Sequence, residues 1–477
     1  MDIAKTYDVL IIGGGIGGLM TAYKLKKNQP SIEVCLMEKG NSIDKRVCLA
    51  TNGNTCKHCK TCSITSGMSG AGAFSDGKLN LGTAYGGILG EELGEQIAMQ
   101  YIKQVDNILL SCSNKGAGEY DYPQIYSSNR ELKTECLRNN LTLLDMDVRH
   151  LGTERNLFIM SNLIKKIEEM GVSIVTCCEV REIGYSSVLN YDYKDYPYEV
   201  SYHCSDSEGT ILTKNIVIAT GRSGADYVSE VCQKLNVETT SNTVDIGVRV
   251  EMKDAIWRHF SQKIYEPKIL YKTKTFEDKT RCFCFNQGGI VSAESNDGII
   301  TANGHSFSNP KLKTENCNFA ILSSINFTQP FNKPTEYCKK IAYLSNAIGN
   351  GNVIVQRYGD LIRGRRTNER RLSQNTVRPT LKATAGDLSL VLPHRILTNI
   401  IETIQALDKV AKGSANDDTL LYGVEAKYYS VKPKTDKNFQ IVKGIYVCGD
   451  CSGRCRGLSQ SGAMGLYIAD NISNSME

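Results

Sequence analysis

The sequence contains no apolar run that approaches the length of about 20 residues needed to span a membrane. It has no long basic tail, and its formal charge of +5 belongs to a chain of 477 residues. We therefore expect neither a membrane nor a nucleic acid as a partner. A glycine-rich turn begins at Gly13, which leaves no room before it for a cleavable export signal. These absences predict a cytoplasmic protein.

Several catalytic and nucleotide-binding patterns are also missing. The chain shows no P-loop, no internal repeat and nothing that resembles a Ser-His-Asp arrangement. Nucleoside-triphosphate hydrolysis and serine hydrolase chemistry are therefore not expected.

Cysteine, in contrast, is abundant, with eighteen residues in the chain. Without an export signal, grouped cysteines favour metal, cluster or redox roles over structural disulfides. Cys35, Cys177, Cys232 and Cys448 lie within apolar or strand-like stretches. We expect these four to be small buried hydrophobic residues.

A polar loop at residues 46–62 holds four of the grouped cysteines: Cys48, Cys56, Cys59 and Cys62. The last three follow the spacing Cys-x-x-Cys-x-x-Cys, which lets three thiolates reach three corners of a [4Fe-4S] cluster. Cys48, or a distant Cys455, would be the fourth ligand. A zinc site, a redox dithiol and a surface loop rich in thiols remain open as alternatives.

A glycine-rich turn near the start of the chain lies between a strand pattern and a helix pattern. The strand-type run 9–12 leads into Gly13-x-Gly15-x-x-Gly18, and a second apolar strand ends at Glu38. The first glycine permits the tight turn, the second lets the backbone approach a pyrophosphate, and the third lets the helix pack closely on the strand. The helix N-terminus attracts a diphosphate, and Glu38 is placed to accept hydrogen bonds from a ribose. An ordinary glycine-rich loop is the alternative, but the strand, helix and acid at this spacing favour dinucleotide binding.

Strand and helix patterns continue along the chain. The expected elements are helices at 91–112, 157–170 and 458–472, and strands at 172–176, 211–219 and 445–448. Residues 180–203 alternate in the manner of antiparallel strands. From 237 to 393 the strand–helix–strand units disappear and only short strand candidates are found.

Three sequence features occur together in this chain. They are the glycine motif with Glu38, the strand end Ala219-Thr220-Gly221, and Gly449-Asp450 followed by a helix. This set resembles the FAD-binding domain of glutathione-reductase-type flavoproteins. The resemblance implies that Asp450 holds the ribityl hydroxyls and that the helix beginning near Leu458 stabilises negative charge on reduced flavin.

Further motifs are similar to those of a bacterial family known only as FAD-dependent, or NAD/FAD-utilising, dehydrogenases of unknown substrate. They cover nearly the whole chain, at residues 70–79, 152–153, 221–224, 245–251, 303–304, 359–366, 386–389 and 418–423. Cys451 and Cys455 depart from the small residues that follow the Gly-Asp pair in this family. The resemblance implies FAD as the cofactor and names no substrate.

The glycine motif and the resemblance together indicate a set of FAD-binding residues. They are Gly13, Gly15, Gly18, Glu38, Lys39, Gly72, Ala73, Val180, Thr220, Gly221, Gly449, Asp450 and Gly462. A second motif for NAD(P)H, which glutathione-reductase-type enzymes carry in the middle of the chain, is absent. The use of NAD(P)H therefore stays open.

The expected fold is α/β, with a doubly wound Rossmann-type FAD-binding domain that includes an antiparallel meander, and an inserted mixed α+β substrate domain. The segments are 1–112, 151–236 and 394–477 for the FAD-binding domain, 113–150 for an irregular connection, and 237–393 for the inserted domain.

Residues that would contact a substrate are harder to identify. Asp76 and Lys78 lie in the glycine-rich loop expected near the flavin, where they could orient it, move a proton or simply hold the loop. His305 follows the Asn303-Gly304 motif, although a buried structural histidine is the commoner outcome. A further group of arginines could bind a carboxylate or phosphate or could form a solvated basic face: Arg249, Arg363, Arg365 and Arg366.

The leading hypothesis is a flavoenzyme that moves a hydride or an electron pair between FAD and a small organic molecule. One alternative is a flavin and iron-sulfur electron carrier whose partner is a protein such as a ferredoxin-like donor. Another is a flavoprotein that acts on tRNA, which the absence of a strong basic surface disfavours.

The cluster hypothesis predicts that protein purified without oxygen contains iron and acid-labile sulfide in about fourfold excess over flavin. Elemental analysis, a sulfide assay and the visible spectrum measure this directly. Flavin without iron would contradict the cluster, and thiol titration with zinc analysis would then separate the dithiol from the zinc site.

Overall fold

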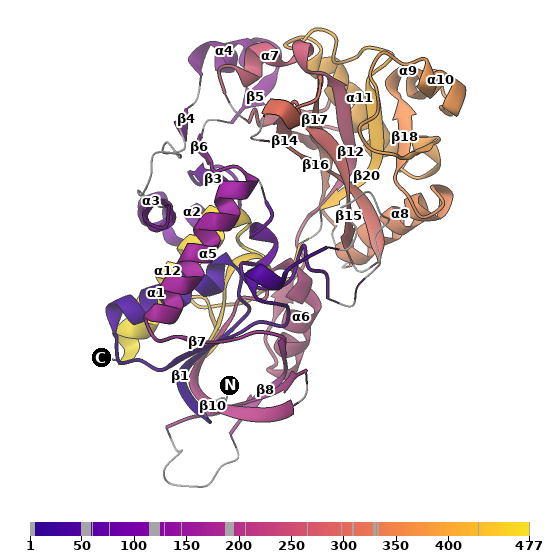
Figure 1. Cartoon of the computed structure of the whole chain (residues 1–477). Helices are drawn as coiled ribbons and strands as arrows, with labels where there is room; N and C mark the ends of the chain where they lie inside the picture. Colours follow the sequence, from indigo (N-terminus) through magenta and orange to yellow (C-terminus); the bar gives the residue numbers. More distant parts are fainter. Residues whose placement is uncertain are drawn as a thin grey trace. The chain divides into compact units, whose positions relative to one another are not determined.

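A computed structural model describes residues 5–48, 59, 61–75, 77–113, 125–127, 129–144, 146–186, 195–205, 207–264, 266–296, 298–307, 310–327, 331, 333–427 and 429–476. The chain divides into two compact units (Figure 1). Unit 1 comprises residues 1–124, 149–241 and 429–477, and unit 2 comprises 125–148 and 242–428.

The borders of the units differ from those expected from the sequence pattern. Residues 394–428 were assigned to the FAD-binding domain, but they lie in unit 2. The reason is that they form a helix, α11 (His394–Leu407), and a strand, β20 (Leu420–Lys427), whose side chains belong to the core of unit 2. A helix followed by a strand is common to both units, so the local pattern does not decide between them.

Unit 1 contains helices and strands in alternation. Its helices are α1 (Ile16–Asn28), α2 (Leu89–Leu93), α3 (Glu95–Ser111), α5 (Thr153–Glu169), α6 (Ala225–Lys234) and α12 (Gly457–Met476). Its strands are β1 (Thr6–Ile12), β2 (Val34–Met37), β3 (Lys78–Leu81), β7 (Ser173–Val175), β8 (Cys178–Tyr185), β9 (Tyr198–Cys204), β10 (Ser207–Ile218), β11 (Thr239–Thr240), β21 (Lys432–Pro433), β22 (Gln440–Val442) and β23 (Ile445–Val447). Strand β6 (Asp147–His150) lies where the sequence passes from one unit to the other.

The main sheet of unit 1 has the strand order β22-β23-β10-β1-β2-β7. Strands β23, β10, β1, β2 and β7 are parallel, and β22 is antiparallel at one edge. Along β1, Val9 and Ile11 point into one core and Leu10 and Ile12 into the other, as the two-residue period of a strand requires. This confirms the predicted Rossmann-type α/β fold.

The two faces of this sheet are covered differently. Helices α1, α3, α5 and α12 contribute to the core on one face. On the other face, the core is formed with the β8–β9 strand pair and α6. Strand β9 extends the sheet from β10, so the antiparallel meander predicted for residues 180–203 is confirmed.

A disulfide joins Cys178 to Cys204 across the β8–β9 pair. The disulfide was not predicted, because the two cysteines are not grouped in sequence and meet only through strand pairing. The predicted burial of Cys35, Cys232 and Cys448 is confirmed. Cys177 is only half-buried, with its Sγ donating to Asn41 Oδ1 at 3.2 Å.

Unit 2 is built mainly from antiparallel strands. Its helices are α4 (Arg130–Arg138), α7 (Arg258–Ser261), α8 (Pro334–Ile348), α9 (Tyr358–Ile362), α10 (Glu369–Ser373) and α11. Its strands are β4 (Ile125–Tyr126), β5 (Leu141–Leu143), β12 (Val244–Lys253), β13 (Ile269–Lys272), β14 (Lys279–Gln287), β15 (Ile290–Asn296), β16 (Ile299–His305), β17 (Asn316–Ile325), β18 (Ile354–Arg357), β19 (Thr384–Ala385) and β20.

The large sheet of unit 2 has the order β19-β18-β20-β12-β17-β14-β13-β5. Its core contains Trp257, the one tryptophan of the sequence, which packs against Phe260, Phe285 and Phe319 with ring centroids 5.1–5.7 Å apart. A second hydrophobic cluster includes residues of β18 and β20. Unit 2 therefore has a hydrophobic core of its own.

Among the described residues, no helix has both the length and the apolar character required to cross a bilayer.

The contact between α1 and α12 offers a test of packing in unit 1. A Cβ on Gly465 would overlap the carbonyl oxygen of Gly17 and lie 2.9 Å from Thr21 Oγ1. We expect Gly465→Ala to lower the free energy of unfolding by about 1–3 kcal/mol, because backbone cannot yield as a flexible side chain can. Thermal unfolding measures the change.

The matched control is Gly184→Ala on β8, where a Cβ meets nothing within 4 Å. Its free energy of unfolding should stay within about 0.5 kcal/mol of the wild-type value. An equal loss in both variants would contradict the close helix contact.

Candidate functional site

The glycine turn between β1 and α1 is tightly packed at two of its three glycines. Gly13 has φ +108°, and its N–H donates to the carbonyl of Met37 at 2.7 Å. A Cβ on Gly13 would overlap the carbonyl oxygen of Ala219, and one on Gly18 would overlap that of Gly13. Both positions therefore require glycine, as the motif predicted.

Gly15 is different, because among the described residues other than its neighbours in the chain, no atom lies within 4 Å of the position that its Cβ would take. Its backbone is extended, with φ −72° and ψ 177°, and it is the N-cap of α1. The unpaired amides at the start of α1 therefore adjoin open space at Gly15.

Glu38 is buried beside this turn, with 7% of its surface exposed. Its Oε2 accepts from the Gly14 N–H at 2.8 Å, and its Oε1 accepts from the N–H groups of Gly40 at 2.9 Å and Gly67 at 3.0 Å. The carboxylate is thus fixed next to the glycine turn, at the place where the sequence predicted a ribose. The neighbouring Lys39 is exposed.

The glycine-rich loop at residues 66–73 lies against the same turn. The Ser69 N–H donates to the Gly14 carbonyl at 2.7 Å, and a Cβ on Gly70 would lie 3.2 Å from Gly15 Cα. Ser69 is 1% exposed, and its Oγ has no hydrogen-bond partner among the described residues. A buried hydroxyl without a partner is costly, so it marks a position where a ligand atom would be stabilising.

Arg46 holds this loop and was not identified from the sequence. Its guanidinium donates to four carbonyls, those of Ser63, Ile64, Met68 and Gly70, at 2.6–2.9 Å. Burial lowers the pKa of Arg46 to about 10, an effect that Glu38 and Cys62 oppose. The side chain therefore stays charged at neutral pH. An arginine within a cysteine-rich loop gives no sequence signal for this role.

Thr220 and Gly221 follow the end of β10, next to the glycine turn. A Cβ on Gly13 would lie 3.0 Å from Thr220 Cα. Near this strand end, Arg222 Nη2 lies 3.8 Å from Asp450 Oδ2, and Ser461 Oγ donates to Asp450 Oδ1 at 3.2 Å. The structure thus brings the predicted strand end and the predicted Gly449-Asp450 pair together. Arg222 and Ser461 were not predicted.

The start of α12 lies next to the glycine-rich loop. A Cβ on Gly72 would lie 2.7 Å from Leu458 Cδ2. Asn156 is fully buried and donates through Nδ2 to the carbonyls of Gly72 at 2.6 Å and Ala73 at 3.2 Å. In the first turn of α12, the buried Ser459 Oγ has no hydrogen-bond partner in the described part of the chain.

Two of the predicted cofactor residues lie among packed side chains. A Cβ on Gly462 would lie 3.1 Å from Val105 on α3 and 3.3 Å from Met20 on α1, so glycine allows these helices to approach. Val180 on β8 belongs to the core between the sheet and the meander. Both positions favour a packing role.

The cysteines after β23 are buried: Cys448, Cys451 and Cys455 are at most 1% exposed. Burial raises the pKa of each thiol above its ordinary value. The Cys451 thiol donates to the carbonyls of Ile218 and Cys448 at 3.2 Å. Thiols in this state are weak nucleophiles.

The cysteine-rich loop is described only in part. Cys48 and Cys62 are half-buried and Cys59 is exposed, whereas Cys56 lies outside the described residues. Among the residues that are described, no three cysteine, histidine or acidic side chains form a group that could hold a metal ion. The [4Fe-4S] cluster and its alternatives therefore remain hypotheses.

The residues that were predicted to contact a substrate differ in burial and in their hydrogen-bond partners. Asp76 lies outside the described residues, and Lys78 begins β3. Arg249 is fully buried, donates to Asn318 Oδ1 at 2.9 Å and lies 3.4 Å from Glu425, which favours a structural ion pair. His305 is exposed at the end of β16, so the expectation of a buried histidine is wrong.

Two stretches of the chain match known families. Residues 11–59 match an NAD(P)-binding Rossmann-like domain, and residues 243–428 match a family described as FAD-dependent protein, C-terminal domain-like. One segment of the chain is therefore similar to a Rossmann-like domain, and another is similar to the C-terminal domain of FAD-dependent proteins. This confirms the resemblance that the motifs predicted.

An uncharacterized protein of Clostridium beijerinckii is 24% identical over 345 residues, which are 68% of this chain and 61% of that protein. The chain thus matches less than two thirds of that relative's length. Among solved structures, the glycine oxidase of Geobacillus kaustophilus shares 12% identity over 99% of this chain and 95% of its own, with a TM-score of 0.40.

A flavoprotein/dehydrogenase of Cytophaga hutchinsonii shares 10% identity over 99% of this chain and 78% of its own, with a TM-score of 0.41. Similarity at this level does not transfer an activity or a substrate.

The buried thiols permit a direct test by alkylation. In iron-free protein at pH 8, we expect iodoacetamide to label Cys59 and to leave Cys451 and Cys455 unlabelled, because burial excludes the reagent and the raised pKa keeps both thiols protonated. Mass spectrometry of the native and the unfolded protein measures the difference. Labelling of Cys451 or Cys455 before unfolding would contradict the burial.

Proposed function

We propose that the chain is an FAD-dependent oxidoreductase that transfers a hydride or an electron pair between flavin and a small organic substrate. The observation that carries the proposal is the open space at Gly15 inside an otherwise close-packed turn. The unpartnered Ser69 hydroxyl in the adjoining loop supports it, because an oxygen-rich diphosphate would accept from both the hydroxyl and the first amides of α1.

The residues around this space fit FAD along its length. Glu38 would accept hydrogen bonds from the adenosine ribose, and the turn from Gly13 to Gly18 would bind the diphosphate. Asp450 would hold the ribityl hydroxyls. Its carboxylate accepts a hydrogen bond from Ser461 and lies near Arg222. Both carboxylate oxygens can accept further hydrogen bonds.

The first turn of α12 would lie at the flavin end of the site. Ser459 there has a buried hydroxyl with no partner among the described residues, which a polar ring atom would satisfy. The positive end of the helix dipole would favour negative charge next to it. When bound, FAD supplies the hydride or electron-pair transfer, while the protein contributes position and electrostatics.

The alternative function is an electron carrier that contains flavin and an iron-sulfur cluster and works with a ferredoxin-like protein. It depends on the Cys-x-x-Cys-x-x-Cys spacing of Cys56, Cys59 and Cys62. The same spacing supports a cluster or a dithiol as a relay within the oxidoreductase.

A substitution at Gly15 tests the proposed diphosphate site without disturbing the fold. The backbone of Gly15 suits any L-residue, and its Cβ position is open, so Gly15→Val should change the free energy of unfolding by less than about 0.5 kcal/mol. We expect FAD affinity to fall more than about hundredfold, because the side chain fills the space of the diphosphate. Fluorescence titration of FAD-free protein measures the affinity.

Gly184→Val on β8 is the matched control and should bind FAD as the wild type does, since its Cβ position is also open. Retention of FAD by a folded Gly15→Val protein would exclude the proposed site.

The reaction class requires a second experiment. FAD-loaded protein is reduced without oxygen and mixed with small two-electron acceptors, namely a quinone, an organic disulfide and an enone, or with oxidised ferredoxin. Flavin reoxidation by a small acceptor at a saturating rate supports the oxidoreductase. Reoxidation by ferredoxin alone would favour the electron carrier.

A further inference from the structure

The positive charge of the chain is concentrated in one segment of unit 2. Residues 357–382 contain eight arginines and lysines and only two acidic residues, whereas the whole chain carries a formal charge of +5. The rest of the chain is therefore close to neutral. This segment contains Arg363, Arg365 and Arg366, for which the sequence pattern allows either an anion-binding site or a solvated basic face.

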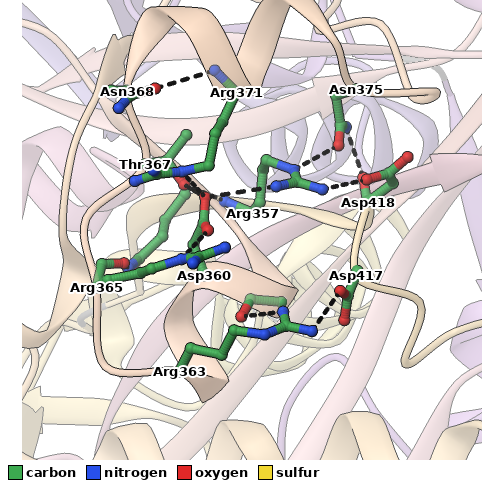
Figure 2. Close-up of polar contacts among 12 residues, drawn as sticks. Arg357, Asp360, Arg363, Arg365, Thr367, Asn368, Arg371, Asn375, Asp417 and Asp418 are labelled. Atoms are coloured by element: carbon green, nitrogen blue, oxygen red, sulfur yellow. Dashed lines mark hydrogen bonds and ion pairs between the residues drawn. The ribbon is translucent and has the colours of Figure 1, made fainter.

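Asp360 is a buried carboxylate that binds several side chains of this segment. It is fully buried, and its Oδ1 accepts from Arg365 Nε at 2.7 Å, while its Oδ2 accepts from Thr367 Oγ1 at 2.8 Å and Arg371 Nε at 3.1 Å (Figure 2). Burial tends to raise the pKa of this carboxyl, but the hydrogen bonds outweigh it and hold the pKa below its usual value. Asp360 is therefore an anion at neutral pH.

Two acidic residues outside the segment, Asp417 and Asp418, neutralise two of its arginines, while Glu369, the second acid of the segment, is exposed at the start of α10. Arg357 forms an ion pair with Asp418, and Arg363 lies 2.7 Å from Asp417. Arg357 also lies 3.7 Å from Asp360. The charges of Arg357 and Arg363 are thus neutralised by Asp418 and Asp417. The one negative charge of Asp360 is then shared by two arginines, Arg365 and Arg371.

Arg366 adds a further cation. Its side chain is exposed and makes no hydrogen bond or ion pair with any described residue, while its carbonyl accepts from Arg371 Nη2. Arg365, Arg366 and Arg371 therefore carry three positive charges against the one negative charge of Asp360.

These arginines also have donors to spare. Arg365 uses Nε for Asp360, its two terminal nitrogens bind nothing in the described part of the chain, and 49% of its side chain is exposed. Arg371 is 29% exposed in its side chain and contacts protein through Nε and Nη2. Because Asp360 holds both side chains through Nε, their outer edges are fixed in place before any ligand arrives.

The chemistry of the ligand follows from this arrangement. An excess of two positive charges on planar guanidinium groups matches a compact oxyanion with two negative charges, such as a phosphate. Single-stranded nucleic acid would need exposed aromatic rings for stacking, but the one aromatic residue of the segment, Tyr358, is buried.

We propose that Arg365, Arg366 and Arg371 form a binding site for a dianionic phosphate group, either free phosphate or the phosphate of a small organic ester. Asp360 is the positioning residue of this site. The site belongs to unit 2 and does not depend on FAD binding in unit 1.

The test is calorimetric titration of full-length, FAD-loaded protein with inorganic phosphate and with glycerol phosphate, at constant ionic strength. Loading with FAD keeps phosphate from the proposed diphosphate site. We expect saturable binding of one phosphate group per chain. Tighter binding of glycerol phosphate than of phosphate assigns the site to an ester, and equal affinity assigns it to the free anion.

Two variants locate the binding. Arg366→Gln removes an exposed side chain that makes no hydrogen bond or ion pair in the described part of the chain, so we expect the fold to be retained. Arg365→Gln removes one guanidinium from Asp360. Each should weaken phosphate binding by about tenfold or more, as expected for a lost charge-assisted contact. Lys340→Gln on α8 is the control, since Lys340 is exposed and its one ion pair within the described residues is with the exposed Glu336. It should leave the affinity unchanged.

Thermal unfolding and flavin content show that each variant is folded. Absence of phosphate binding in wild-type protein, or equal affinity in all the variants, would overturn the proposal. Preference for citrate or for an oligonucleotide over both phosphates would overturn the assigned ligand class. If the protein fails to retain FAD, the variants still report on the unit 2 site, so failure of the two proposals is distinguishable.

Discussion

The carboxylate of Glu38 joins three turns of unit 1 that are distant in sequence. Its oxygens accept hydrogen bonds from the backbone of Gly14, Gly40 and Gly67, which belong to the glycine turn, the end of β2 and the glycine-rich loop. A carboxylate buried with three backbone donors is a strong, directional tie. Glu38 and Arg46 both bond to the glycine-rich loop that adjoins the open space at Gly15.

Two buried carboxylates of unit 2 form ion pairs with arginine, and the two ion pairs leave different net charges. Glu425 and Arg249 are both fully buried, and their charges balance inside the protein. Asp360 is equally buried, yet its arginine partners reach the surface and outnumber it. The Arg249–Glu425 pair is neutral and lies inside the sheet, between β12 and β20. The second leaves positive charge and unused donors exposed, which is the physical requirement for binding an anion.

The strand, turn and helix around Gly13 could be predicted because each depends on neighbouring residues. Gly13 and Gly18 are required by contacts with backbone a few residues away or on the adjacent strand, and Glu38 falls at a fixed distance after them. The parts that were not predicted depend on distant contacts. Arg46, Ser69 and Asn156 acquire their roles from loops that meet only in the folded chain.

The sequence by itself determined the Rossmann-type turn, the strand that precedes Thr220 and the helix that follows Asp450, because local periodicity and glycine spacing specify such elements. Only the tertiary structure decided that residues 394–428 belong to unit 2, that Cys178 pairs with Cys204, and that Arg365 and Arg371 share Asp360. Strand pairing and charge balance are properties of residues brought together from separate segments, and a linear pattern does not record which segments meet.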